Sequence, residues 1–224
     1  MNHTPASFDD NPIRQRQRHR MVDQQLRSRD ITDERGLDAM LRVPRHLFVP
    51  DHLLDDAYAD APLPIGNHQT ISQPYIVALT TQLVRPEPNS RALDIGTGSG
   101  YQAAILAELV DEVFSVEIVG PLAESAHKRL ATLGYKNIHI RCGDGHQGWP
   151  ERAPFDVITV AAAPREVPRP LLEQLKKGGR MVIPVGGASQ ELLLIEKQDD
   201  GRLREQTIAP VRFVPMTGAG REEG

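Results

Sequence analysis

A glycine-rich turn is the stretch of this 224-residue sequence with the clearest chemical use. It contains Gly96, Gly98 and Gly100, and it separates a short apolar run from a helix expected to begin at Tyr101. Glycines at alternate positions let the backbone approach a ligand with no Cβ in the way. The first amides of the following helix have no partner inside that helix, so they face the same ligand. The turn therefore predicts a nucleotide-type binding site at the carboxyl end of a parallel strand.

The spacing and charge of this turn indicate which ligand it favours. Dinucleotide-binding turns carry G-x-G-x-x-G, whereas this one reads G-x-G-x-G and has Asp94 two residues before its first glycine. A carboxylate there is badly placed beside a pyrophosphate and well placed beside a cation. S-adenosylmethionine has no phosphate and carries a sulfonium and an ammonium group, so the charge favours it. An NAD-dependent dehydrogenase is the alternative that the spacing and Asp94 oppose.

Acidic residues accompany three of the expected strands. Asp94 belongs to the first, Glu117 lies in the second and Asp144 follows the third. Because ligands in a doubly wound sheet lie outside the carboxyl ends of the strands, we expect all three acids at one site. Glu117 is placed to accept hydrogen bonds from both ribose hydroxyls, and Asp144, beside Gly145, to accept one from an adenine amino group. Asp156 starts its strand at the opposite edge, and we interpret it as structural.

The composition argues against several other classes of function. The net charge of −4 gives no reason to expect nucleic acid, and no apolar run approaches the ~20 residues of a membrane span. The eight histidines and the single cysteine, Cys142, show no paired metal-ligand spacing, so we expect no metal. One cysteine cannot form an internal disulfide, which fits a reducing cytoplasm, and we expect Cys142 to pack in the core. We interpret the basic stretch 14–20 as a solvated helix face; an RNA-associated protein is the alternative it leaves open.

Strand and helix patterns alternate from Arg91 onward, which predicts an α/β fold with a doubly wound, mostly parallel sheet. The end of the chain instead predicts an antiparallel β-hairpin that closes the sheet edge. The expected strands are 92–95, 113–118, 138–142, 155–160 and 181–185, the expected helices are 101–110, 120–134 and 170–177, and the hairpin pairs 191–197 with 203–208.

The first part of the chain carries weaker patterns. We expect a disordered tail over residues 1–18, a helix capped by Thr32, loops at 43–50 and 57–67, and Ser72 as the N-cap of a helix with Pro74 in its first turn. The expected organisation is one domain over 19–217: N-terminal helices and substrate-side loops (19–90), a cofactor-binding core (91–186), C-terminal strands (187–217), and then a tail (218–224).

Six segments occur together in a recognisable order: 43–50, Gln-Thr-Ile-Ser-Gln-Pro at 69–74, the glycine turn at 93–100, Gly-Asp-Gly at 143–145, 179–186, and Val-Arg-Phe-Val-Pro-Met-Thr at 211–217. In these segments the chain resembles the bacterial protein-L-isoaspartate O-methyltransferases, a family of class I S-adenosylmethionine-dependent methyltransferases with a Rossmann-like fold. The resemblance covers about Arg20 to Thr217. Its most specific parts are Thr-Ile-Ser-x-Pro and the last segment.

The resemblance implies methyl transfer from S-adenosylmethionine to the α-carboxylate of an L-isoaspartyl residue in a damaged protein or peptide. The ester then closes to a succinimide, whose hydrolysis returns some normal aspartate. A carboxylate is already ionised at pH 7, which agrees with the lack of an evident general base. The family is usually monomeric. A class I methyltransferase that acts on a small-molecule acid is the closest alternative.

The same resemblance implies roles for individual residues. Ser72 is the active-site serine between cofactor and substrate, Thr70 and Ile71 flank the methyl group, and the backbone near Val214 takes an extended substrate peptide. The expected cofactor-binding residues are Asp94, Gly96, Gly98, Gly100, Glu117, Asp144, Gly145 and Thr217.

Overall fold

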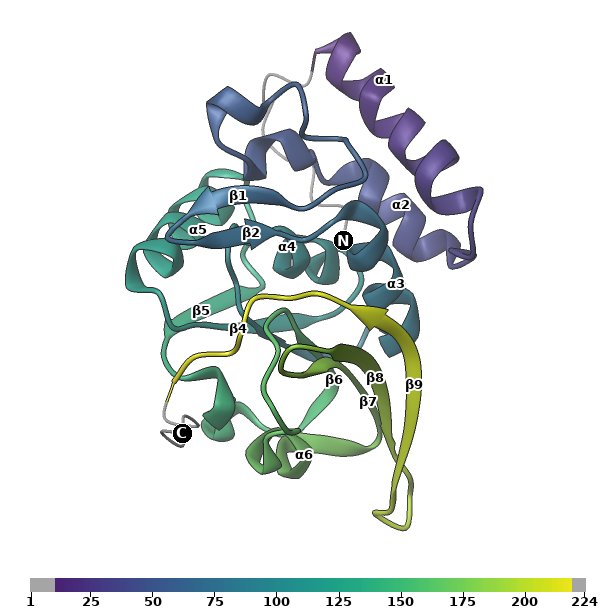
Figure 1. Cartoon of the computed structure of the whole chain (residues 1–224), viewed down its shortest axis with the longest axis vertical. Helices are drawn as coiled ribbons and strands as arrows, with labels where there is room; N and C mark the ends of the chain where they lie inside the picture. The colour runs from purple at the N-terminus through teal and green to yellow at the C-terminus, as the bar shows by residue number, and fades with distance from the viewer. Residues whose placement is uncertain (1–10, 219–224) are drawn as a thin grey trace.

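Apolar segments that alternate with glycine turns build a seven-stranded sheet (Figure 1). In the computed structural model, which describes residues 11–218, the strand order is β5-β4-β3-β6-β7-β8-β9. The strands from β3 to β7 are parallel, and β8 and β9 add an antiparallel hairpin at one edge, so the predicted sheet and hairpin are confirmed. The strands are β3 (Arg91–Ile95), β4 (Glu112–Glu117), β5 (Ile138–Cys142), β6 (Phe155–Val160), β7 (Leu175–Gly186), β8 (Gln190–Lys197) and β9 (Leu203–Val211).

The strand order reverses between β3 and β6. β4 and β5 extend the sheet on one side of β3, whereas β6 and β7 extend it on the other. The segments that leave the carboxyl ends of β3 and β6 therefore diverge and leave a crevice between them. The Ala161 amide, just after β6, donates to the Ile95 carbonyl at 2.8 Å, so the two strand ends stay together beneath the crevice.

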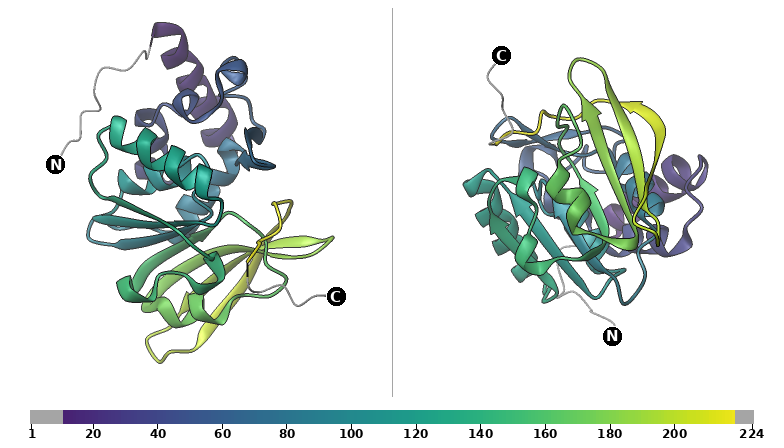
Figure 2. Two further views of the ribbon diagram at one scale, coloured as in Figure 1. Left: turned by 90° about the vertical axis from the view of Figure 1, so that its left-hand side faces the viewer. Right: turned by 90° about the horizontal axis from the view of Figure 1, so that it is seen from below.

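Helices cover both faces of the sheet (Figure 2). Because side chains alternate along a strand, β3 serves two cores: Ala92 packs with α3, α4 and the end of α5, while Leu93 and Ile95 pack with α6 on the other face. None of the helices that the structure describes combines the length and apolar character needed to cross a membrane. The helices are α3 (Pro74–Val84), α4 (Tyr101–Ala107), α5 (Gly120–Thr132) and α6 (Arg169–Gln174).

The N-terminal segments pack onto the first of these cores, into which Met21 and Leu37 are buried. Figure 1 shows α1 and α2 side by side above the sheet, with the short β1–β2 pair next to them. The elements are α1 (Pro12–Met21), the π-helical turn η1 (Val22–Arg27), α2 (Glu34–Arg42), the 3₁₀ turns η2 (Arg45–Phe48) and η3 (Asp51–Leu53), β1 (Leu63–Gly66) and β2 (Gln69–Ile71).

The predicted tail over residues 1–18 is wrong for its described part, and residues 1–10 lie outside the described residues. The Asn11 side chain accepts hydrogen bonds from the amides of Ile13 and Arg14, both at 3.0 Å, and so caps α1. Arg14 donates to the Leu54 carbonyl at 2.7 Å, and Arg18 is only 6% exposed, so the basic stretch is not a fully solvated face. Contacts with distant residues hold this helix, which is why its own sequence shows no period.

Other local predictions fail for similar reasons. Asp33, not Thr32, caps α2, because its carboxylate accepts from the Gly36 amide at 3.2 Å, whereas the Thr32 amide donates to Gln82 at 2.7 Å. Ser72 does not cap α3: Gln73 holds the N-cap position with no side-chain hydrogen bond. The expected loops at 43–50 and 57–67 contain η2 and β1, whose short segments lack a periodic pattern. Cys142 is exposed at the end of edge strand β5, so its predicted place in the core is wrong.

The join between α6 and β7 also differs from its prediction. The helix ends at Gln174 rather than at 177, and Gly178 and Gly179 lie inside β7 instead of stopping the helix. The register between β6 and β7 shifts between Phe155 and Val157, so the chain makes an irregular step there. A Cβ on Gly179 would lie 2.7 Å from the Lys176 carbonyl and 2.9 Å from that of Asp156, so only glycine fits this step.

Gly179→Ala is therefore expected to destabilise the fold, because backbone rather than a flexible side chain must move. Overpacking typically costs about 1–3 kcal/mol, and each kcal/mol lowers the melting temperature by about 2–4 °C at this size. Gly187→Ala is the matched control, since a Cβ there has nothing within 4 Å. Thermal unfolding of both variants makes the measurement, and equal melting temperatures would contradict the packing argument.

Candidate functional site

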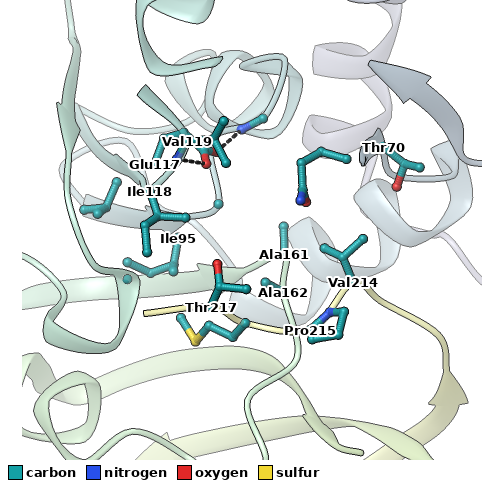
Figure 3. A pocket seen from close by; sticks show the side chains of 16 residues that line it. Thr70, Ile95, Glu117, Ile118, Val119, Ala161, Ala162, Val214, Pro215 and Thr217 are labelled. Atoms are coloured by element: carbon teal, nitrogen blue, oxygen red, sulfur yellow. Dashed lines mark hydrogen bonds between the residues drawn. The ribbon is translucent and has the colours of Figure 1, made fainter. Parts of the chain in front are cut away.

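The carboxyl ends of β3, β4 and β6 border a cavity that the C-terminal segment closes from the other side (Figure 3). Its empty space, open mouth included, is about 590 Å³. No lysine or arginine stands among the described residues that line it. The lining residues are Gln69, Thr70, Ile95, Gly96, Gly98, Val116, Glu117, Ile118, Val119, Gly145, Ala161, Ala162, Val214, Pro215, Met216 and Thr217.

The glycine turn forms part of this wall. Gly96, Gly98 and Gly100 all have left-handed backbone, with φ of 88°, 53° and 90°, which explains why glycines recur at alternate positions. Gly96 and Gly98 line the cavity. Gly100 does not: it sits at the N-cap of α4, and a Cβ there would lie 3.0 Å from Leu130 of α5. The third glycine therefore permits helix packing rather than contact with a ligand.

Glu117 ends β4 with its carboxylate in the cavity wall. It is 5% exposed, and its two oxygens accept from the amides of Gly98 at 2.8 Å and Val119 at 2.9 Å (Figure 3). These two bonds fix the carboxylate and the loop on either side of it. Each carboxylate oxygen has a second lone pair, so Glu117 can still accept from two ligand hydroxyls.

Asp94 does not line the cavity but lies beneath it, fully buried. Ser115 on β4 donates to one of its oxygens at 2.8 Å, and Thr159 on β6 donates to the other at 2.9 Å. Thr97 in the glycine turn lies 2.6 Å from the Ser115 hydroxyl, so the network reaches the cavity wall. Burial raises the pKa of Asp94 to about 6, a shift that Glu117 reinforces and the two hydroxyl donors oppose.

Asp144 and Gly145 follow β5 at the entrance to a 3₁₀ turn (Gly145–Gln147). Gly145 lines the cavity, and a Cβ there would lie 2.6 Å from Ile95 and 2.9 Å from Met216. Asp144 is not part of that lining; its Oδ1 accepts from the His146 amide at 2.9 Å and lies 3.0 Å from His146 Nδ1. The structure therefore places Gly145 in the wall and Asp144 at its margin.

The segment after β9 covers the crevice. Ala163 donates to the Val214 carbonyl and accepts from the Met216 amide, both at 2.8 Å, so this segment pairs with the chain that leaves β6. Gln190 accepts from the Phe213 amide at 2.6 Å and donates to its carbonyl at 3.1 Å. Figure 3 shows Thr217 across the cavity from Glu117 and Val119, with Pro215 and Val214 farther along the same segment.

A second cavity adjoins the first and shares Thr70, Ala161 and Val214 with it. Ser72 lines this second cavity and is half-buried, whereas Ile71 is only 4% exposed and lines neither cavity. Among the described residues of its wall, Arg212 alone carries a charge. The lining residues are Pro62, Thr70, Ser72, Gln73, Ile76, Ala161, Pro210, Val211, Arg212, Phe213 and Val214.

Sequence reasoning missed the apolar part of both walls. Ile118, Val119, Met216 and the alanines after β6 look like ordinary strand and loop residues in the sequence, and only the return of the C-terminal segment makes them walls. One signal was available: small residues at 161–163 leave room at the strand-order reversal.

The geometry decides which ligand class fits the first cavity. A pyrophosphate would find no basic side chain in the wall, so a dinucleotide is disfavoured. A nucleoside without phosphate matches Glu117 for its ribose and apolar side chains for its base. Among residues 11–218, no group of three or more His, Cys, Asp or Glu residues gathers in a way that could hold a metal ion.

Comparisons with known proteins agree with this fit. The family model for protein-L-isoaspartate(D-aspartate) O-methyltransferase matches residues 16–221. A protein-L-isoaspartate O-methyltransferase of Opitutus terrae is 58% identical over 205 residues, which are 91% of this chain and 88% of that protein. One from Synechococcus sp. is 56% identical over 208 residues, 89% of this chain and 85% of that protein.

Solved structures give the same result. A protein-L-isoaspartate O-methyltransferase superposes with a TM-score of 0.82 and 31% identity, over 90% of this chain and 66% of that one. A Plasmodium falciparum chain described as a β-aspartate methyltransferase, in complex with S-adenosyl-L-homocysteine, has a TM-score of 0.78 and 25% identity over 89% of this chain and 98% of its own.

The buried acid beneath the site makes a prediction about stability and pH. The pKa of Asp94 is about 6 in the folded protein against an ordinary value of 3.8, so the folded state binds this proton more readily. The stability that this proton contributes is fully present below pH 3.8. It is lost as pH rises from 3.8 to about 6, and it does not change further above that. Asp94→Asn should therefore gain stability relative to the native protein as pH rises from about 4 to 6.

Urea unfolding at several pH values between 4 and 7 makes this measurement. Asp199→Asn, in the exposed hairpin turn, is the matched control, because the difference between the two variants cancels all other titrations. A stability difference that does not change with pH would show that Asp94 is not a strained buried carboxylate.

Proposed function

This chain belongs to the protein-L-isoaspartate(D-aspartate) O-methyltransferase family, and we propose how its two adjoining cavities share the reaction between them. The protein is a repair methyltransferase that moves a methyl group from S-adenosylmethionine to the α-carboxylate of isoaspartyl residues. One observation supports this division of roles. The cavity whose described wall lacks basic side chains and the cavity lined by Ser72 share Thr70, Ala161 and Val214.

The first cavity is proposed to hold the cofactor. Glu117 accepts hydrogen bonds from the ribose hydroxyls, Gly96 and Gly98 present backbone to the ligand, and Gly145 with Asp144 borders the base. Asp94 is buried behind the cavity wall, and its negative charge favours a cationic ligand in the cavity because little solvent screens the interaction. Thr217 closes the side opposite Glu117. When bound, S-adenosylmethionine supplies an electrophilic methyl group on a sulfonium.

The second cavity is proposed to hold the isoaspartyl residue. Ser72 is free of the capping role that its sequence suggested, so its hydroxyl can donate to the substrate carboxylate and orient it. Ile71 supports Ser72 and Thr70 from below, and the shared wall near Val214 takes the peptide backbone. The carboxylate is already ionised, so the chain needs to align it rather than deprotonate it.

We further infer that the enzyme works as a monomer in the cytoplasm and does not use nucleic acid. The net charge of −4 supports the lack of a nucleic-acid partner, and the single cysteine supports a reducing cytoplasm. The monomeric state is what the family resemblance implies. The rival acceptor is a small-molecule acid, and the second cavity argues against it, because its wall continues directly into β9 and offers an extended surface.

The function is tested by transfer of labelled methyl to two matched peptides, one isoaspartyl and one aspartyl. Base-labile label on the isoaspartyl peptide alone is the expected result. Label on neither peptide, with intact binding of S-adenosylhomocysteine, would redirect the search to small acids.

Ser72→Ala is expected to lower kcat by about 10- to 100-fold, because a hydrogen bond to a charged group contributes roughly 1.5–3 kcal/mol. Cofactor affinity and melting temperature should not change, since Ser72 neither lines the first cavity nor caps α3. Ser125→Ala on exposed α5 is the control. Parallel loss of turnover and stability would mean that Ser72 is mainly structural.

Glu117→Ala is expected to weaken binding of S-adenosylhomocysteine at least tenfold in calorimetry, because two charge-assisted hydrogen bonds are lost. Since Glu117 also anchors the amides of Gly98 and Val119, the melting temperature of the variant must be recorded beside its affinity. Glu124→Ala, which removes an exposed acid from α5, serves as the control. Unchanged affinity would refute the ribose role.

A further inference from the structure

A groove at the C-terminal end of α3, the end away from Ser72, shares no lining residue with the two cavities described above. The C-terminal end of α3 forms one wall, and β7, β8 and β9 form the other. Four arginines and three acids lie among its lining residues. The lining residues are Thr32, Asp33, Arg35, Gln82, Leu83, Arg85, Pro86, Glu87, Arg180, Leu194, Glu196, Arg204, Gln206 and Ile208.

The charges in this groove do not balance locally. Arg35 lies 3.4 Å from Glu87, and the Asp33 carboxylate is engaged in capping α2. The Glu196 carboxylate forms ion pairs with two guanidinium groups. That of Arg180 is in close contact, and that of Arg204 lies at 3.9 Å.

Arg85 adds a third guanidinium with no ion pair in the described chain. Burial lowers the pKa of Arg180, and the positive charges of Arg85 and Arg204 lower it further, while Glu196 raises it. This end of the groove therefore holds three guanidinium groups and one carboxylate, and it is electropositive although the whole chain carries a net charge of −4.

Arg85 adopts a backbone conformation that residues other than glycine disfavour. It is the C-cap of α3 with φ of 49° and ψ of 64°, a left-handed position where helices usually place glycine. A side chain with a Cβ is disfavoured in that conformation. A glycine would satisfy the backbone better, so stability does not explain an arginine here, whereas a guanidinium directed at an anion does.

The groove is continuous with the acceptor cavity through one strand. Arg204, Gln206 and Ile208 of β9 line the groove, and Pro210 to Val214, directly after them, line the second cavity. β9 is the outer strand of the sheet, so its free backbone edge runs from one site to the other (Figure 1). Phe213 lies seven positions after Gln206, which at ~3.4 Å per position is a path of about 24 Å.

We propose that this groove is a docking site for acidic segments of the protein substrate, carried about seven to ten residues from the isoaspartyl residue. The inference rests on the proposed function and adds a preference among its substrates. Carboxylate side chains in the groove would form charge-assisted, bidentate bonds with Arg85 and Arg204 while the isoaspartyl residue occupies the cavity beside Ser72. Docking there raises the affinity for the substrate and leaves the chemical step unchanged.

The test uses isoaspartyl peptides with a spacer of eight residues and either three glutamates or three glutamines beyond it, on the N-terminal or the C-terminal side. For one of the two directions, the glutamate peptide should have a KM at least tenfold lower than its glutamine partner, with the same kcat. The difference should shrink as salt rises. Equal KM values in both directions would overturn the proposal.

Variants separate this site from general charge effects. Arg85→Gly and Arg204→Gln should each raise the KM for the glutamate peptide and leave that for the glutamine peptide unchanged. Arg85→Gly also relaxes the left-handed backbone, so its melting temperature should not fall, and lost stability cannot explain lost affinity. Arg202→Gln, in the exposed hairpin turn beside Asp200, is the matched control. An equal effect of the control would overturn the proposal.

Two further measurements keep this proposal distinct from the proposed function. A short isoaspartyl peptide without acids should be methylated equally by the native protein and by both variants; if no enzyme form methylates it, the proposed function fails. In that case the docking site is still tested by binding of a labelled triglutamate peptide to the native protein and to both variants, measured by fluorescence anisotropy. Inhibition by inorganic phosphate with no binding of that peptide would show a free-anion site and overturn the proposal.

Discussion

The buried carboxylate of Asp94 is the constraint on which the site depends. In the sheet register it stands directly opposite Ser115 on β4 and Thr159 on β6, and it accepts a hydrogen bond from each. One side chain thus joins the three strands whose carboxyl ends border the cavity. Burial of an ion is unfavourable unless its lone pairs are satisfied, so the two hydroxyls must stay where they are. Through Ser115 the same network holds Thr97, and with it the glycine turn.

The reaction also requires that two ligands come into contact, and the C-terminal segment provides for this. A methyl transfer needs donor and acceptor in line and in contact, which a single open crevice cannot impose. The segment from Phe213 to Thr217 crosses the crevice, pairs with Ala163 and is clamped by Gln190. It closes the first cavity, proposed for the cofactor, with one end and lines the second cavity, proposed for the acceptor, with the other. The small side chain of Ala161 between the cavities lets the two ligands approach.

The sequence predicted best where structure is local. Strands 138–142 and 155–160 were placed to the residue, because each is a short run of strand-forming residues between turns. The start of α1 and the cap of α2 were misplaced because Arg14 and the Thr32 amide bond to groups far along the chain. Asp94 was expected to meet a cation directly, and only the register with β4 and β6 shows it beneath the wall. Ser72 and Val214 came from family resemblance, since nothing local marks them.

The edge of the sheet fits an enzyme whose substrates are other proteins. A free outer strand invites pairing with any extended chain, and proteins usually guard such edges with charge or proline. β9 carries Arg204 and Glu205 at one end and Pro210 at the other, so association of two identical edges is hindered by like charges and by a missing amide. Pro210 offers no amide to any partner, but Arg204 attracts an acidic polypeptide where it repels the Arg204 of a second copy. The charge that hinders pairing of two copies therefore leaves this edge open to the acidic protein substrates that we propose.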